Sequence, residues 1–253
     1  MAGNALFDAA EEKKFLTGRP FREFPQPEPL DQHGPATILS MVNQKGGVGK
    51  TTSTINLGAC LAEQGRKVLL VDLDPQGALS AGLGVSHDEE QVTVYDLLFD
   101  NTASIHAAIR HSNMPGLDLV PANIDLSAAE IQLVNEVGRE HTLARALRPV
   151  RNEYDIIIID CGPSLGLLTV NALACSAGVM IPMECEYFSL RGLALLTDTV
   201  EKVRDRINFD LDIVGIMVTM FDRRTTHARE VMDRVVEVFG ERVFDTVITR
   251  TVR

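Results

Sequence analysis

Residues Lys45 to Thr52 read KGGVGKTT, and this stretch decides the fold. It follows the apolar run ATILSMVN (36–43) and leads into TTSTINLGACLA (51–62), a pattern that predicts a strand, a glycine-rich loop and a helix in that order. Glycines in such a loop permit backbone turns that aim several N–H groups, and the positive end of the helix, at phosphate groups. The stretch therefore predicts a phosphate-binding loop for a nucleotide.

Two side chains of this loop have predicted roles. Lys50 is placed to neutralise the β and γ phosphates of ATP, and the hydroxyl of Thr51 is placed to ligate Mg²⁺. ATP and Mg²⁺ are therefore the expected cofactors. The predicted nucleotide contacts in the loop are Gly46, Gly47, Val48, Gly49, Lys50, Thr51 and Thr52.

The loop departs from the common pattern GxxxxGK[ST]. Gln44 occupies the first glycine position, and Lys45 adds a second lysine at the mouth of the loop. This position is poorly suited to the phosphates of its own chain but within reach of those of a facing chain. A cation supplied in trans accelerates other NTPases by roughly 10³ to 10⁵. We therefore expect an ATP-bound homodimer in which Lys45 acts catalytically on the partner's nucleotide.

Three aspartates are expected at the same edge of the sheet. Asp72 and Asp74 end the apolar run KVLLVDLD, and Asp160 ends IIIID. Ligands of open parallel sheets bind at the carboxyl ends of the strands. Asp74 is predicted to position the attacking water, Asp72 to support the following loop or the Mg²⁺ shell, and Asp160 to bind Mg²⁺ through water. Because no glutamate follows Asp160, slow intrinsic hydrolysis is expected.

Apolar runs and helical patterns alternate through the rest of the chain. Further strands are predicted at 117–121, 156–160, 179–183 and 213–219. Helices are predicted at 127–134, 165–175, 189–207 and 227–239. Strands alternating with helices favour right-handed crossovers. The predicted fold class is α/β: a P-loop NTPase with a doubly wound, mostly parallel sheet and helices on both faces.

Composition and the two ends define the predicted domains. The 253 residues are 45% apolar and 23% charged, typical of a globular protein. The sequence shows no apolar run of membrane-spanning length and no signal peptide, so a cytoplasmic protein without stable membrane association is expected. Residues 36–253 are predicted as the ATPase domain. Residues 1–35 are proline-rich and predicted as a flexible arm, with a docked arm and a short helix at 5–16 left open.

The charge distribution leaves a nucleic-acid partner open. The net charge of −11 argues against one, because phosphate contacts need Lys and Arg. However, ten of the 24 basic residues, nine of them Arg, lie in residues 201–253. A local basic face near this end of the chain is therefore compatible with the sequence.

Together these motifs resemble the ParA/Soj group of chromosome and plasmid partition ATPases, within the deviant P-loop family that also includes MinD. The resemblance runs from about Ile38 to Arg253. It rests on NQKGGVGKTT, VDLDPQG, IIIDCGPSLGLLTVNAL, ECEYFSLRGL and TMFDRRT. The DPQ and ECEYF segments favour the partition branch over the MinD branch.

The resemblance implies roles for further residues. Met220 and Asp222 lie where family members approach the base. Arg224 and Arg253, with their neighbours Arg223 and Arg250, fall where family members contact DNA without sequence preference. It also implies a nucleoid-associated dimer on duplex DNA, released when a ParB-type partner protein stimulates hydrolysis.

The sequence departs from the family pattern at two places. Gly162 stands where the family more often has Pro, which should loosen the turn after Asp160. Family members continue for some tens of residues after the position of Arg253, so a further C-terminal helix is expected outside this sequence. Two alternatives stay open: a membrane-directed switch of the MinD type, and a small-molecule ATP-dependent ligase of the dethiobiotin synthetase type.

Overall fold

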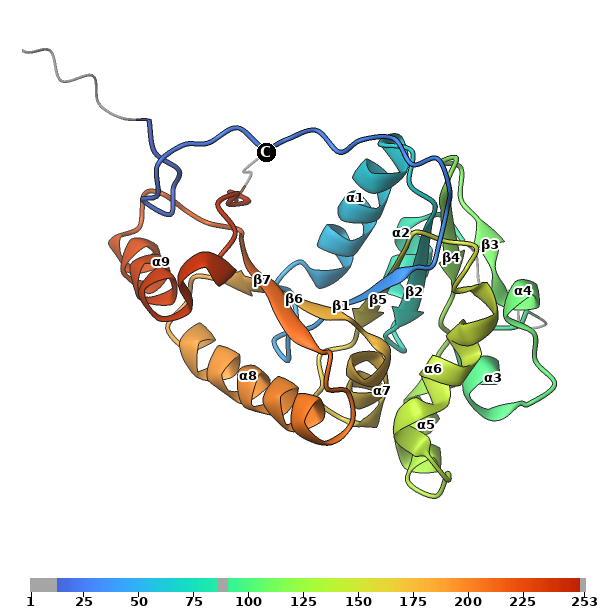
Figure 1. Cartoon of the computed structure of the whole chain (residues 1–253). Helices are drawn as coiled ribbons and strands as arrows, with labels where there is room; N and C mark the ends of the chain where they lie inside the picture. Colours follow the sequence, from blue (N-terminus) through green and yellow to red (C-terminus); the bar gives the residue numbers. More distant parts are fainter. Residues whose placement is uncertain (1–12, 86–90, 251–253) are drawn as a thin grey trace, which may run out of the picture.

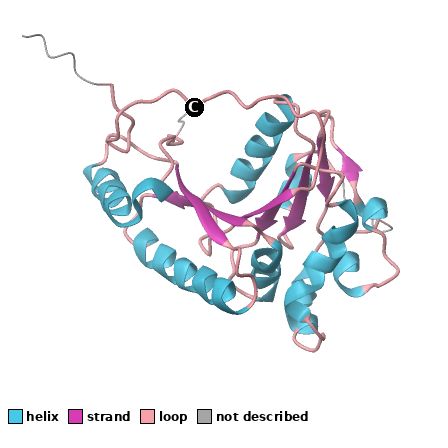
Figure 2. Cartoon of the chain, in the orientation of Figure 1, coloured by secondary structure: helices cyan, strands magenta, loops and turns pink. Residues whose placement is uncertain are grey.

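The computed structural model describes residues 13–85 and 91–250, and these form a seven-stranded sheet flanked by helices. The strand order is β3-β4-β2-β5-β1-β6-β7, with only the β3–β4 pair antiparallel. Figure 2 shows the sheet in magenta between helices in cyan. The strands are β1 (Thr37–Met41), β2 (Val68–Leu73), β3 (Arg110–His111), β4 (Leu117–Val120), β5 (Ile156–Cys161), β6 (Gly178–Glu184) and β7 (Asp212–Thr219).

Helices lie on both faces of this sheet, with α1 on one side and α7 and α8 on the other (Figure 1). The α-helices are α1 (Lys50–Glu63), α2 (Ala78–Gly82), α3 (Val94–Phe99), α4 (Ile105–Ala108), α5 (Leu126–Leu133), α6 (Thr142–Leu147), α7 (Leu167–Cys175), α8 (Ser189–Arg206) and α9 (Thr226–Phe239). Short 3₁₀ turns follow at Arg139–His141, Arg148–Val150 and Gly240–Arg242. None of the helices in the described ranges is long and apolar enough to cross a membrane.

Strand β2 shows why the central strands are mostly apolar. All six of its residues are buried, because helices cover both faces of the sheet. Leu69 and Val71 point into the larger core, whereas Val68 and Leu70 pack with the α1 face in a second core. The sheet therefore separates two apolar layers, and its carboxyl edge is left for polar side chains.

The predicted fold class is confirmed, and the predicted strands and helices lie within two residues of the observed bounds. The short helices α2, α3, α4 and α6, each of six residues or fewer, and the two-residue strand β3 were not predicted. Such elements contain less than two helical turns or one strand alternation, so their residues show no periodicity. Each of these helices forms with at least two of its residues buried in the folded protein, and β3 forms by pairing with β4.

The described part of the arm, residues 13–35, runs over the surface above α1 (Figure 1). Its Arg19 Nε lies 2.6 Å from the Asp245 carboxylate, and Arg22 pairs with the same group at 3.1 Å. At its other end, His33 lies 2.8 Å from Asp155. In this structure, therefore, the described part of the arm contacts the rest of the chain near both of its ends. The possible helix at 5–16 lies mostly outside the described residues, and residues 13–16 are not helical.

Candidate functional site

The glycine-rich loop joins β1 to α1 at the carboxyl edge of the sheet. Gly47 and Gly49 have φ of 76° and 85°, left-handed values that favour glycine, and Gly49 caps the N-terminus of α1. The loop encloses a cavity of about 260 Å³. The cavity is lined by Gly46, Gly47, Gly49, Lys50, Thr51, Thr52, Asp74, Pro163 and Met220.

Two residues that were not predicted hold the loop in place. The side-chain amide of Asn43 donates to the Pro182 carbonyl at 2.7 Å, and its oxygen accepts the Lys45 backbone N–H at 2.9 Å. The hydroxyl of Thr219 donates to the Val48 carbonyl at 2.8 Å. Asn43 adjoins the motif and was a possible candidate. Thr219 lies 171 residues from Val48 in the chain, so no local pattern indicates it.

Lys50 lines this cavity. The residue is only 7% exposed, and its Nζ donates to the Lys45 carbonyl at 3.2 Å. Burial lowers the pKa of Lys50, although the carboxylates of Asp160 and Asp74 partly offset this effect. An anion in the cavity would compensate the buried ammonium, as the predicted phosphate role requires.

Asp160 lies behind the loop with one carboxylate oxygen unused. Its Oδ1 accepts a hydrogen bond from Thr54 at 3.3 Å, while its buried Oδ2 has no partner among the described residues. Burial raises the pKa of Asp160 to about 7, and the nearby carboxylate of Asp72 acts in the same direction. A buried carboxylate oxygen beside a threonine hydroxyl fits a hard cation with oxygen ligands. The residues predicted for Mg²⁺ therefore suit it chemically at Thr51 and Asp160.

Asp72 is fully buried, and its carboxylate faces the loop after β2. Ser80 donates to Asp72 Oδ2 through its backbone N–H at 3.0 Å and its hydroxyl at 2.7 Å. The Asp74 N–H donates to Oδ1 at 3.2 Å. Burial raises the pKa of Asp72, although the Ser80 hydrogen bonds oppose this. Since both Asp72 oxygens accept hydrogen bonds, whereas Asp160 keeps one oxygen without a partner among the described residues, the geometry favours the loop role of Asp72 over the Mg²⁺ shell.

Asp74 faces the cavity beside the turn that follows β5. Its Oδ1 accepts the Gln76 N–H at 3.0 Å. A Cβ placed on Gly162 would lie 3.5 Å from the Asp74 carboxyl carbon, so the two loops are in contact. This position, in the cavity that Lys50 also lines, is compatible with a role in orienting water.

The two predicted base contacts are placed differently. Met220 lines the cavity with φ of 50°, a rare value for a bulky residue that is often found at functional sites. Asp222 does not line it, and its carboxylate accepts both Arg224 Nε at 3.0 Å and Arg224 Nη2 at 2.8 Å. Only Met220 is thus brought to the loop in this structure.

The predicted DNA contacts gather beyond the end of β7. The Arg250 N–H donates to the Phe221 carbonyl at 3.1 Å, which places Arg250 beside the segment carrying Arg223 and Arg224. Both Arg224 and Arg250 pair with carboxylates of their own chain, Arg250 with Glu184 at 2.7 Å. Arg253 lies outside the described residues.

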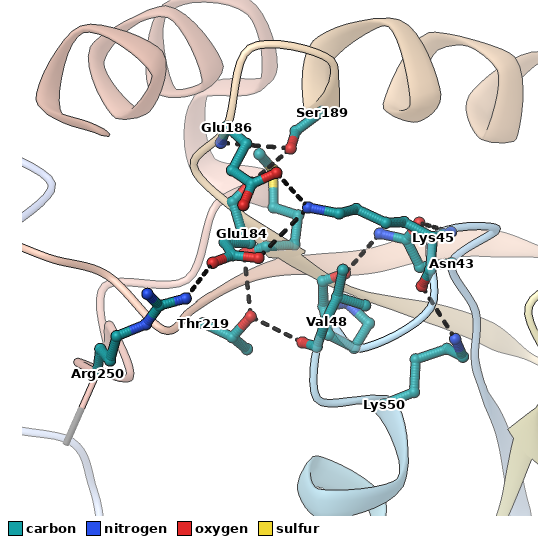
Figure 3. Close-up of polar contacts among 11 residues, drawn as sticks. Asn43, Lys45, Val48, Lys50, Glu184, Glu186, Ser189, Thr219 and Arg250 are labelled. Carbon is teal, nitrogen blue, oxygen red and sulfur yellow. Dashed lines mark hydrogen bonds and ion pairs between the residues drawn. The ribbon is translucent and has the colours of Figure 1, made fainter. Parts of the chain in front are cut away.

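The Lys45 side chain points away from the cavity. Its Nζ lies 2.5 Å from Glu186 Oε2 and 3.3 Å from Glu184 Oε2 (Figure 3). Burial lowers the pKa of Lys45, but the two carboxylates outweigh burial and raise it overall. Neither glutamate was predicted as a site residue, although both stand in the ECEYF segment. Lys45 therefore does not line its own phosphate-binding cavity.

Comparison with known proteins identifies relatives over most of the chain. A family model described as "AAA domain" matches residues 36–213. The sporulation initiation inhibitor protein Soj of Bacillus subtilis is 50% identical over 216 residues, 85% of each chain. An uncharacterized Mycobacterium tuberculosis protein is 68% identical over 238 residues, 94% of this chain and 75% of its own length.

Among solved structures, cobyrinic acid a,c-diamide synthase of Mycobacterium smegmatis with ADP and magnesium is similar, with 42% identity and a TM-score of 0.80. The match covers 85% of this chain and 87% of that one. A plasmid partition protein of Borrelia burgdorferi is 27% identical with a TM-score of 0.73, over 85% of this chain and 90% of that one. The glycine-rich loop, the carboxylates at the sheet edge and these relatives place the chain in the ParA/Soj family of P-loop partition ATPases.

Proposed function

We propose that this protein is a DNA-segregation ATPase. ATP pairs two chains, the pair binds duplex DNA without sequence preference, and a ParB-type partner protein stimulates slow hydrolysis and release. The proposal rests mainly on the orientation of the Lys45 side chain. Lys45 does not line the phosphate-binding cavity of its own chain, and its ammonium group pairs with Glu186 instead. A lysine needed only for its own nucleotide would line the cavity, as Lys50 does.

The cavity residues suit Mg²⁺ and ATP. Similar solved structures contain ADP or an ATP analogue with magnesium. In this chain Lys50 and the loop N–H groups would bind the phosphates, and Thr51 and Asp160 would hold the cation. The metal, when bound, offsets negative charge on the phosphates. Asp74, at the cavity wall, would orient the attacking water.

The arginines at the end of β7 supply the proposed DNA contacts. Arg223, Arg224 and Arg250 lie on adjoining segments, although Arg224 and Arg250 must exchange a carboxylate of their own chain for a DNA phosphate. Binding through phosphates depends on salt, with a log–log slope of about −0.9 per phosphate contacted. Because the whole chain carries a net charge of −11, binding should depend on this local face.

Sedimentation with and without duplex DNA, at two salt concentrations, tests the proposal. With ATP and Mg²⁺ we expect a dimer that co-sediments with DNA of arbitrary sequence at low salt and dissociates at high salt. Without nucleotide we expect neither a dimer nor co-sedimentation with DNA. A protein that pairs with ATP but ignores DNA at both salts would refute the DNA-segregation role and leave only the nucleotide switch.

One similar solved structure is a cobyrinic acid a,c-diamide synthase, and this similarity favours a second candidate function, that of an ATP-dependent amide synthase. Such an enzyme needs a small carboxylate acceptor for turnover. A partition ATPase needs only DNA and a partner protein. ATP turnover measured with each in turn separates the two: stimulation by DNA and a ParB-type protein without any small acceptor supports partition, and turnover that requires an acceptor supports synthesis.

A further inference from the structure

Lys45 is held by two carboxylates from one turn of the chain. Glu184 ends β6, and Glu186 lies in the turn before α8 (Figure 3). Ser189 braces this turn, because its hydroxyl donates to the Glu184 carbonyl at 2.6 Å and accepts the Glu186 N–H at 3.4 Å. The carboxylates therefore come from a turn with its own internal support, and we call Glu184 and Glu186 the Lys45 clamp.

The two glutamates of the clamp differ in exposure and in the number of their ion-pair partners. Glu184 is 13% exposed in its side chain and is shared, since its Oε1 accepts Arg250 at 2.7 Å while its Oε2 lies 3.3 Å from Lys45. Glu186 is 55% exposed, and Lys45 at 2.5 Å is its only ion-pair partner in the described part of the chain. Glu186 is therefore the carboxylate that acts on Lys45 alone.

We propose that Glu186, assisted by Glu184, is a positioning residue that holds Lys45 within its own chain and thereby opposes pairing. Two chains can join across ATP only when each Lys45 exchanges these carboxylates for phosphates of the facing chain. Because one dimer needs two exchanges, any change in the clamp enters the pairing equilibrium twice. The inference rests on the proposed function, since it assumes that Lys45 acts in trans.

The clamp sets the protein concentration at which pairing occurs, and this concentration is measurable. The test uses Glu186→Gln, which keeps the shape of the side chain and removes its charge. Glu237→Gln is the matched control, because Glu237 lies on α9 and pairs with exposed Arg234 rather than Lys45. Glu184→Gln is less suitable, since it also releases Arg250.

The midpoint of pairing is measured by analytical ultracentrifugation with a non-hydrolysable ATP analogue and Mg²⁺. We expect Glu186→Gln to pair at a roughly two- to fivefold lower protein concentration than the wild type, as befits the loss of a partly exposed ion pair in each chain. Glu237→Gln should match the wild type. An unchanged or higher midpoint for Glu186→Gln, or an equal shift in the control, overturns the clamp.

Lys45→Ala separates this inference from the function on which it rests. If Lys45→Ala pairs and turns over ATP like the wild type, Lys45 does not act in trans, and the proposed role of Glu186 in opposing pairing is wrong as well. If Lys45→Ala loses pairing while Glu186→Gln leaves the midpoint unchanged, only the clamp is wrong. In a variant that carries both Lys45→Ala and Glu186→Gln, pairing should match that of Lys45→Ala alone, because the ammonium group that Glu186 binds is gone.

Discussion

The hydroxyl and the backbone N–H of Ser80 both donate to Asp72 Oδ2, at 2.7 and 3.0 Å. This contact joins the start of α2 to the end of β2, and the loop that carries Asp74 lies between the two attached points. Asp72 also accepts the Asp74 N–H at 3.2 Å. The position of the proposed water-orienting carboxylate thus depends on a second, fully buried aspartate.

Asp72→Ala should destabilise the fold by about 1–3 kcal/mol, because the buried N–H and hydroxyl of Ser80 and the partly buried N–H of Asp74 lose their acceptor. Urea unfolding followed by circular dichroism measures the change. Asp198→Ala is the control: Asp198 is an exposed α8 residue paired with Lys202, and its loss should stay within about 0.5 kcal/mol. Equal effects of the two substitutions would contradict a bracing role for Asp72.

Asp74→Ala should uncouple nucleotide binding from hydrolysis. Asp74 lines the cavity, but Lys50, Thr51 and the loop backbone supply the phosphate contacts. The variant should therefore bind ATP and pair as the wild type does, while single-turnover hydrolysis falls below detection. On DNA it should remain bound after a ParB-type protein is added. A variant that releases DNA at the wild-type rate would show that Asp74 does not orient the water.

Sequence patterns predicted the parts of the site that local chemistry specifies. The loop from Gly46 to Thr52, and Asp74 after its apolar strand, have fixed spacing, and seven of the nine residues lining the cavity were predicted from them or their motifs. With Met220, which the family resemblance supplied, only Pro163 had been given no role. Motif spacing is informative here because strand, loop and helix are consecutive in the chain.

Contacts between residues far apart in the chain could not be predicted from motif spacing. The Thr219 hydroxyl reaches the Val48 carbonyl only because β7 and β1 lie in one sheet, and the Lys45 clamp forms because β6 ends beside the loop. Asp72 illustrates a further limit. Its spacing from Asp74 did not distinguish a carboxylate facing Mg²⁺ from one facing Ser80, since that depends on where α2 begins.

The docked part of the arm depends on Asp245, whose side chain is 3% exposed. Asp245→Ala removes the carboxylate that binds Arg19 and Arg22, so the arm should leave the surface more often. Limited trypsin digestion reports this, because cleavage after Arg22, which is followed by Glu23, should become several-fold faster. Asp210→Ala changes an exposed aspartate elsewhere and should leave the cleavage rate unchanged. Equally fast cleavage in the wild-type protein would favour the flexible arm.

Asp222→Asn should strengthen DNA binding if Arg224 contacts DNA. The Asp222 carboxylate binds Arg224 through two nitrogens, and these hydrogen bonds hold the pKa of Asp222 well below its usual range. The carboxylate is therefore charged at any working pH and competes with DNA phosphates for the arginine. Neutralising it frees Arg224, so affinity for duplex DNA should rise for all sequences alike.

Arg224→Ala should have the opposite effect on DNA binding, and sedimentation with duplex DNA at several salt concentrations measures both variants. With ATP and Mg²⁺, the affinity of Arg224→Ala should fall and its log–log salt slope should become shallower by about 0.9, the contribution of one phosphate contact. Arg234→Ala, on α9 and paired with Glu237, is the control and should keep the wild-type slope. In the Arg224→Ala background, Asp222→Asn should retain only the small gain from removing one negative charge near the DNA. If it retains its full effect there, the carboxylate acts on DNA directly and Arg224 is not the group it restrains.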